Sequence, residues 1–191
     1  MKTKNHPPLF EHEGKSLMVG INTENCARYV ILAVRDPLGY DIDVATWIRS
    51  FMDQGNLVSD TKMFVTYTGT YKGVPVTVCS TGSGGPDTEL ALMDFFKYTN
   101  ADTFIRVGTS GTYQEEVNIG DIVIAIGAVR DDGVTAEYVK STYPALANFE
   151  VVLALTEAAE KRGFSYHLGL TRSNDSCLVG QIGRASCRER V

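Results

Sequence analysis

Arg106 stands at the end of a short apolar run, directly before a turn rich in glycine and hydroxyl groups. The run Thr103–Val107 contains β-branched and aromatic residues that favour a buried strand, and the turn Gly108–Gly111 follows it. Glycines let a backbone turn tightly and approach a ligand closely. A guanidinium is costly to bury unless something anionic pairs with it. The pattern fits an oxyanion site, and it fits equally an arginine paired with a structural Asp or Glu.

A second glycine-rich turn precedes a predicted helix. The segment Thr81–Thr88 reads TGSGGPDT, and Asp87 or Thr88 is expected to cap a helix at Glu89–Lys97. Such a junction directs free backbone N–H groups and the positive end of a helix toward a bound anion. It lacks the Gly-Lys-Ser/Thr of a phosphate-binding P-loop and the third glycine of a dinucleotide fingerprint. A tight packing turn explains it as well.

The remaining elements place both turns on an α/β sheet. A stripe from Val44 to Met52, with Asp43 as its cap and Gly55 as its end, predicts a helix that packs Trp47 and Phe51 into the core. The other predicted elements are a strand at 27–34, a hairpin over 63–80 that turns at 71–73, a strand at 122–128, a polar loop at 130–143, a helix at 148–162 ended by Gly163, and a strand at 166–170. Strands alternating with helices predict helices on both faces of the sheet, with ligands bound at the carboxyl ends of its strands.

Composition narrows the class of protein. The chain has 191 residues, 43% of them hydrophobic, and a formal net charge of −5. It shows no Lys/Arg patch for nucleic acid, no apolar run near the ~20 residues that span a bilayer, and no secretory signal. Its four cysteines have no paired spacing, which favours a reducing compartment. We expect a cytoplasmic protein that acts on small molecules, with no nucleic-acid and no membrane partner.

Three regions are expected along the chain. Residues 1–15 carry Pro7-Pro8 and scattered charge, and are predicted to be a disordered leader. Residues 16–181 are predicted to form one domain. Residues 182–191 have no apolar periodicity and a sudden excess of arginine, and resemble an in-frame translation of a sequencing-library adapter. We treat this tail as non-native, in which case the natural protein continues past Gln181.

Several motifs in order resemble uridine phosphorylases of the nucleoside phosphorylase family. They are VTVCSTGSGG at 76–85, ADTFIRVGTSG at 101–111, NIGDIVIAIGA at 118–128, and shorter matches at 143–150 and 175–181. The resemblance implies a three-layer α/β/α fold with a mixed central sheet. It also implies a pentosyltransferase for reversible phosphorolysis of a pyrimidine nucleoside, which converts uridine and phosphate to uracil and ribose 1-phosphate in nucleoside catabolism and salvage. Phosphate is then the co-substrate, no metal or cofactor is needed, and the protein is a homo-oligomer, a hexamer built from dimers.

The resemblance also assigns site residues. Arg106 and Thr109 match the catalytic pair that holds phosphate. Thr109, with four further residues, matches the positions that contact the nucleoside; the four are Ser110, Gly111, Cys177 and Gln181.

Four positions depart from the family pattern. Arg35 lies where the family's first phosphate loop has glycine, and is expected to supply the charge of that loop's lost arginine. Lys62 replaces an arginine that reaches a neighbouring subunit's phosphate, and Met18 replaces a histidine that the adjacent subunit contributes. Cys177 replaces a phenylalanine that stacks on the base. A purine nucleoside phosphorylase, a nucleosidase of the same fold, and a non-catalytic nucleoside-binding homologue therefore remain alternatives.

Overall fold

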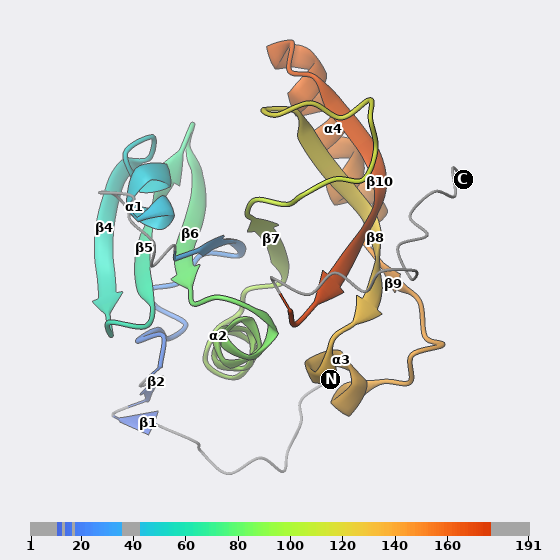
Figure 1. Ribbon diagram of the computed structural model, residues 1–191. Helices are drawn as coiled ribbons and strands as arrows, with labels where there is room; N and C mark the ends of the chain where they lie inside the picture. Colours follow the sequence, from blue (N-terminus) through green and yellow to red (C-terminus); the bar gives the residue numbers. More distant parts are fainter. Residues whose placement is uncertain (1–10, 13, 17, 36–42, 177–191) are drawn as a thin grey trace. The chain divides into compact units, whose positions relative to one another are not determined.

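The described chain forms two compact units. The computed structural model describes residues 11, 12, 14–16, 18–35 and 43–176 (Figure 1). The first unit is Met1–Thr109 and the second is Ser110–Val191. None of the helices formed by these described residues has the length and apolar character required to cross a membrane. The predicted leader falls mostly outside the described residues, although Glu11–His12 pairs with Lys15–Ser16 inside it.

The first unit is built on a mixed five-stranded sheet in the order β4-β5-β6-β3-β7. Its elements are β1 (Glu11–His12), β2 (Lys15–Ser16), β3 (Tyr29–Val34), α1 (Val44–Arg49), β4 (Asp53–Asp60), β5 (Val65–Tyr71), β6 (Val74–Thr81), α2 (Gly85–Tyr98) and β7 (Thr103–Val107). Strands β6, β3 and β7 are parallel, and β5 is antiparallel to both β4 and β6. The predicted hairpin is confirmed, since β5 and β6 join at Lys72 and Gly73, both with positive φ as a two-residue turn requires.

Side chains on the two faces of this sheet contact different helices. The Thr46 hydroxyl of α1 lies 2.9 Å from the Tyr67 hydroxyl of β5. On the other face, the Phe104 ring of β7 packs edge-on against Phe95 and Phe96 of α2, with centroids 5.8 and 5.3 Å apart. Helices therefore cover both faces of this sheet, as predicted.

The core of the first unit lies between the sheet and α2. Its buried cluster is made of Val19, Ile21, Val30, Leu32, Phe64, Cys79, Ala91 and Phe95. Each large apolar side chain buried in such a cluster stabilises the fold by about 1.5–3 kcal/mol. This cluster fixes β3 and β7 against α2, and so fixes the strand ends that matter below.

Asp94 ties the segment before β3 to α2. The Ser16 hydroxyl donates to its carboxylate, and the Val19 amide does so at 3.1 Å. Ser16 is itself buried, and desolvation raises the pKa of Asp94. The carboxylate thus replaces water as the partner of two buried donors.

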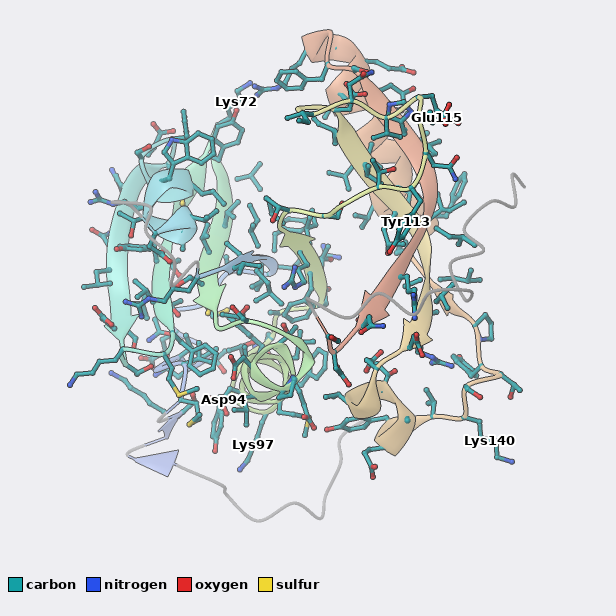
Figure 2. All side chains as sticks on the ribbon, viewed as in Figure 1. Lys72, Asp94, Lys97, Tyr113, Glu115 and Lys140 are labelled. Carbon is teal, nitrogen blue, oxygen red and sulfur yellow. The ribbon has the colours of Figure 1, made fainter. Side chains whose placement is uncertain are left out.

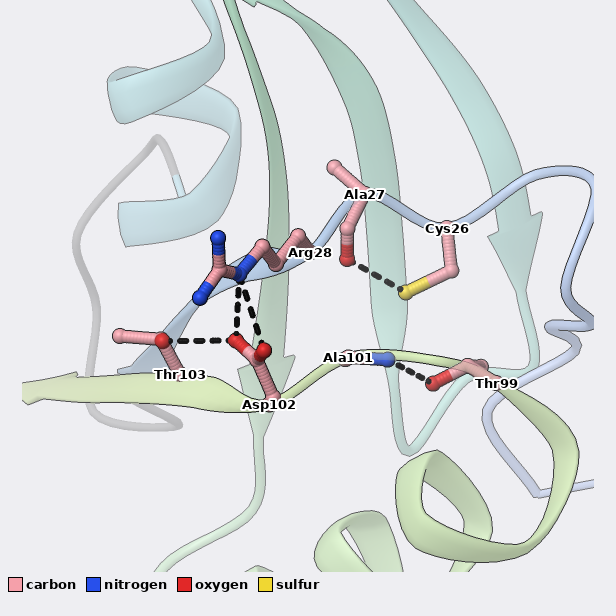
Figure 3. A network of polar contacts seen from close by, with 7 residues as sticks. All are labelled: Cys26, Ala27, Arg28, Thr99, Ala101, Asp102 and Thr103. Atoms are coloured by element: carbon pink, nitrogen blue, oxygen red, sulfur yellow. Dashed lines mark hydrogen bonds and ion pairs between the residues drawn. The ribbon is translucent and has the colours of Figure 1, made fainter.

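Arg28 and Asp102 join the amino ends of β3 and β7 (Figure 3). The Arg28 Nε atom lies 2.9 Å from the Asp102 carboxylate, which also accepts a 2.8 Å hydrogen bond from the Thr103 hydroxyl. The Arg28 hydrogen bond, followed by that of Thr103, lowers the pKa of Asp102. Both charged side chains are more than half exposed. The pair therefore adds little to the free energy of unfolding, and its main effect is to help align β3 with β7.

The first helix corrects two expectations. It ends at Arg49 with Ser50 as its C-cap, so Gly55, which lies in β4, does not end it. Trp47 and Phe51 are each 57% exposed in this chain, so neither belongs to the core. Their rings pack edge-on with centroids 5.1 Å apart, while Ala45 is the residue of α1 that is fully buried. A six-residue helix is too short to bury the whole predicted stripe, although its predicted cap is confirmed because the Asp43 side chain accepts from the Thr46 amide.

The second unit contains a three-stranded sheet in the order β10-β8-β9. Its elements are β8 (Ile122–Asp131), α3 (Gly133–Tyr138), β9 (Ala145–Leu146), α4 (Phe149–Arg162) and β10 (Tyr166–Asn174). Gly163 ends α4 at φ 69°, as predicted, and Asn148, predicted as the first helical residue, is its N-cap. Helix α3 was not predicted, because it has only six residues and lies in a polar segment that shows no apolar periodicity.

Gly69 of β5 allows this strand to approach the edge strand β4 closely, which gives a test of the sheet. A Cβ atom at Gly69 would lie 2.8 Å from the Gly55 Cα atom and 3.0 Å from the Asp53 carbonyl oxygen. Because both obstacles are backbone, we expect Gly69→Ala to lower the free energy of unfolding by about 1–3 kcal/mol, measured by urea denaturation. Gly169→Ala is the matched strand control, since nothing lies within 4 Å of its Cβ position. Equal stability of the two variants would contradict the close approach.

Candidate functional site

Three segments leave the first sheet at the same edge. Val34 of β3 pairs with Thr81 of β6, and Ala33 pairs with Val107 of β7, so the three parallel strands end together. The Arg35 amide continues the ladder by donating to the Thr81 carbonyl at 2.7 Å. The carboxyl ends of parallel strands are where α/β sheets bind ligands.

Arg106 lies at this edge and folds back over the turn that follows it. It pairs with Leu32 and shares the α2 face with Phe104, two residues earlier on the strand. A Cβ atom at Gly108 would lie 2.9 Å from Arg106 Nη1 and 3.3 Å from a Val34 methyl group. Glycine at 108 therefore makes room for the guanidinium.

Among the residues that the structure describes, the Arg106 guanidinium meets no carboxylate. No hydrogen bond or ion pair joins it to any residue that the structure describes. The residue keeps access to water, yet partial desolvation lowers its pKa. A guanidinium keeps its charge in proteins and offers five donors in a fixed fork. Of the two interpretations open from the sequence, the described geometry favours the oxyanion site.

Arg35 and Lys62 lie in direct contact at the same edge. The Arg35 Nη1 atom donates to the Lys62 carbonyl oxygen. Lys62 follows β4 in the four-residue connection to Val65, which pairs with Ser80 near the end of β6. The structure thus brings two of the predicted phosphate-binding cations together.

Asp60 is a contributor that the sequence analysis missed. Its carboxylate accepts a 2.9 Å hydrogen bond from the Lys62 amide, a local Asx-type contact that the order Asp60-Thr61-Lys62 would allow one to anticipate. Met18, at the position where the family has a histidine, is close by through its backbone: its carbonyl accepts a 2.6 Å hydrogen bond from the Thr61 hydroxyl.

The remaining predicted contacts divide between the units. Thr109 is exposed at the end of the first unit, while Ser110 and Gly111 are exposed at the start of the second. Cys177 and Gln181 lie outside the described residues. All the predicted phosphate-binding residues therefore belong to the first unit: Arg35, Lys62, Arg106 and Thr109.

The glycine-rich junction before α2 suits packing better than anion binding. Helix α2 begins earlier than predicted, at Gly85, and the predicted side-chain cap is absent because Gly84 is its N-cap. The Asp87 carboxylate lies against Gly82, where a Cβ atom would come within 1.9 Å of Oδ2. This carboxylate already places a negative charge beside the helix start, which opposes a second anion there.

Other reactive side chains are held in structural roles. Burial raises the pKa of the Cys79 thiol to about 12, and burial also raises the pKa of Cys26; neither is an activated nucleophile. His167 Nε2 lies 2.9 Å from Asp121 Oδ2 inside the second unit. Glu115 is exposed on the segment before β8 (Figure 2).

The site can therefore do one kind of chemistry with the groups in view. Arg106, Arg35 and Lys62 supply cationic donors, and Thr109 supplies a hydroxyl. No cluster of metal-ligating side chains forms among the residues described. Cationic and hydroxyl donors of this kind suit a small multivalent oxyanion, because charge-assisted hydrogen bonds are about twice as strong as neutral ones.

Gly108→Ala tests the position of the Arg106 guanidinium. The new methyl group would displace Nη1, so we expect about three- to tenfold weaker binding of inorganic phosphate with a folded protein. Isothermal titration calorimetry measures the affinity, and Gly169→Ala, which meets open space, serves as control. Unchanged affinity would place the anion elsewhere.

Asp121 makes the stability of the second unit sensitive to acid. The Asn118 amide, then His167 and then Ser165, lower its pKa from 3.8 to about 2. A depressed carboxylate pKa contributes stability that is full above about pH 4 and is lost as pH falls toward 2. We expect Asp121→Asn to lower stability at pH 6 and to flatten the loss between pH 4 and 2, as measured by denaturant unfolding. Parallel pH profiles of the two proteins would contradict this.

Comparison with known proteins agrees with this geometry. The Phosphorylase superfamily model matches residues 37–189. A uridine phosphorylase of Thermococcus kodakarensis is 43% identical over 169 residues, which cover 88% of this chain and 58% of the relative. One of Escherichia coli is 37% identical over 141 residues, 74% of this chain and 55% of the relative. A guanosine phosphorylase of Halorubrum lacusprofundi is 31% identical over 129 residues, 68% of this chain and 53% of the relative.

A solved structure shares the fold. The crystal structure of uridine phosphorylase from Vibrio fischeri matches with a TM-score of 0.80 and 30% identity, and the match covers 89% of this chain and 68% of that one. The mixed sheet with flanking helices is thus the nucleoside phosphorylase fold, as predicted. The chain spans a little over half the length of the curated relatives that it matches. It belongs to the phosphorylase superfamily.

Proposed function

We propose that this protein is a pentosyltransferase that binds inorganic phosphate at Arg106 and uses it to cleave a pyrimidine nucleoside, uridine first of all. The observation that carries the proposal is the Arg106 guanidinium, held over Gly108 at the shared end of the parallel strands, with no carboxylate partner among the described residues. The names of several relatives, uridine phosphorylases among them, support the choice of reaction and substrate.

In this reaction the protein must hold phosphate and the nucleoside together, and it must stabilise the positive charge that develops on the sugar. A phosphate oxygen forms a bond to the ribose C1′ atom while the C1′–N bond breaks, and the electron pair of that bond leaves with the base, which then takes up a proton. The sugar passes through a cationic, oxocarbenium-like state, so an anion fixed beneath it lowers the barrier. Arg106 orients that phosphate and Thr109 offers a hydroxyl to it and to the ribose. Phosphate is the nucleophile, so the scheme uses neither a covalent enzyme intermediate nor a cofactor.

Recognition of the nucleoside is assigned to the segments around the second unit. Ser110 and Gly111 offer exposed backbone near the base, Gln181 is to read the pyrimidine edge, and Cys177 gives far less stacking surface than the phenylalanine of the family. We propose a cytoplasmic homo-oligomer, a hexamer built from dimers, as the working assembly.

Phosphate dependence is the direct test. A protein extended to the length of its relatives is incubated with uridine, with and without inorganic phosphate, and uracil and ribose 1-phosphate are measured by chromatography. We expect release of uracil only with phosphate. Arg106→Met should lower kcat/KM for phosphate about 30-fold or more, because a charge-assisted contact to an oxyanion contributes about 2 kcal/mol or more.

Three outcomes separate the alternatives. Equal release of uracil without phosphate would make the protein a nucleosidase. Faster turnover of guanosine or inosine than of uridine would make it a purine enzyme. Thermal stabilisation by uridine with no turnover would make it a binding protein. Arg28→Met is the charge-matched control, because Arg28 lies at the opposite, amino ends of the same strands. It should leave kcat/KM unchanged.

A further inference from the structure

We propose that Asp131 is a positioning residue for recognition of the nucleoside base. It fixes the end of β10 through Arg172 and Asn174. From that end the chain continues to Cys177 and Gln181, the two residues that follow β10 and are assigned to the base. The inference rests on the proposed function, since it concerns the base of the same nucleoside. The sequence analysis did not single out Asp131, and its carboxylate acts through β10 without touching the substrate.

Asp131 lies at the carboxyl end of a parallel pair of strands. Strands β8 and β10 run side by side (Figure 1), and their pairing ends where Asn174 meets Asp131. The carboxyl ends of parallel strands are where α/β sheets bind ligands. Because the ladder with β8 stops at Asn174, the chain that follows β10 depends on other contacts for its direction.

One carboxylate oxygen of Asp131 accepts hydrogen bonds from two side chains of β10. Arg172 Nε donates to Asp131 Oδ2 at 3.0 Å, and Arg172 Nη2 donates to the same oxygen. The side-chain amide of Asn174 also donates to Oδ2, at 3.4 Å. Arg172 and Asn174 are two residues apart on the strand and therefore share one face of the sheet. Both are held to a single point on β8.

The ion pair orients the strand end more than it stabilises the fold. The Arg172 side chain is only 15% exposed, whereas that of Asp131 is 41% exposed. Two N–H groups of one planar guanidinium on one oxygen fix the orientation of the arginine as well as its distance. An ion pair with a solvent-exposed partner adds little to the free energy of unfolding. Its main effect is therefore on where the end of β10 lies relative to β8.

Further side-chain contacts carry this order past the end of β10. Asn174 Oδ1 accepts a 2.7 Å hydrogen bond from the Ser176 amide, a local Asx turn. Asp175 Oδ2 accepts a 2.8 Å hydrogen bond from the amide of Gly133, the first residue of α3. The Asn174 side chain thus joins Asp131 on one side to the Ser176 backbone on the other. Ser176 directly precedes the first of the residues assigned to the base.

Recognition of a base edge depends on such positioning. Hydrogen bonds weaken steeply as their distance and angle depart from the optimum, and a misplacement of about 1 Å can cost about 10²-fold in rate. The residues assigned to phosphate all belong to the first unit, whereas Asp131 and its partners belong to the second. Loss of the Asp131 carboxylate is therefore expected to weaken the interaction with the nucleoside and to spare that with phosphate.

The test measures KM for uridine and KM for phosphate separately, in the protein extended to the length of its relatives. Asp131→Ala should raise KM for uridine about three- to tenfold, while KM for phosphate and kcat change less than twofold. A purely structural loss would lower the active fraction, and so kcat, with both KM values unchanged. An unchanged KM for uridine, or equal changes in the two KM values, would overturn the proposal.

Arg172→Met completes a double-mutant cycle with Asp131→Ala. It should raise KM for uridine by a similar factor, because it removes the other half of the same contact. The double variant should be within twofold of the more affected single variant. Multiplying effects would show that the two side chains act separately, and would overturn the proposal.

Asn174→Ala gives a second variant that keeps both charges. It removes the side chain that joins Asp131 to the Ser176 amide, and Asn174 is exposed, so the protein is expected to fold. KM for uridine should rise about two- to fivefold, and amide hydrogen exchange of Ser176, followed by NMR without substrate, should accelerate at least about threefold. An unchanged KM for uridine would contradict the proposal even if Asp131→Ala failed to fold.

Asp102→Ala is the matched control. It removes an equal charge and breaks an exposed arginine–carboxylate pair between parallel strands, but at the amino ends of β3 and β7. KM for uridine should change less than twofold. A rise as large as that of Asp131→Ala would show that the effect is not particular to the end of β10, and would contradict the proposal.

The same measurements separate this proposal from the function on which it rests. If uracil is released without phosphate, phosphorolysis fails as the function, and KM for uridine in the variants still decides the positioning role. If uridine binds without turnover, its dissociation constant, measured by titration calorimetry, takes the place of KM. If Arg106→Met lowers kcat/KM for phosphate while Asp131→Ala and Asn174→Ala leave KM for uridine unchanged, the function stands and the positioning role fails.

Discussion

The parallel register of β6, β3 and β7 is the constraint on which the rest of the structure depends. It carries three chain segments to one edge, and the buried cluster under β3, with Phe95 of α2, fixes that register. A slip of one residue in β7 would turn Arg106 to the opposite face, away from Gly108. The position of one guanidinium is thus decided by packing along the whole strand.

Two arginines at opposite ends of the same strands show what the constraint produces. Arg28, at the amino ends, is met by Asp102, which also accepts from Thr103. Arg106, at the carboxyl ends, is partly desolvated and is met by no carboxylate of the described residues. Leaving a partly buried cation unpaired costs stability, and a site that binds an anion recovers that cost only when the ligand is present.

Local patterns were enough to predict much of this fold. The hairpin at Lys72-Gly73, the caps at Asp43 and Asn148, and the αL stop at Gly163 each follow from the chemistry of a few neighbouring residues. Strand β4 was missed because DQGNLVSD is polar and lacks alternation, so only its pairing with β5 makes it a strand. Trp47 and Phe51 were misplaced for a related reason: periodicity shows which residues share a helix face, but not how much of that face is covered.

The site was predictable as a set of residue types and not as an arrangement. The position of Arg106 follows from a strand and a glycine turn, both visible in the sequence. The hydrogen bond from the Arg35 guanidinium to the Lys62 carbonyl joins residues far apart in the chain, and no local pattern predicts it. Anion placement is equally a matter of arrangement. Asp87 lies against Gly82 after β6 and places its negative charge at the start of α2. The cationic residues lie elsewhere: Arg35 follows β3, Arg106 is near the end of β7, and Lys62 is in the connection before β5. In the site that we propose, these charges repel a dianion from the helix terminus and attract it to the guanidinium groups, so that side chains rather than the helix dipole select its position.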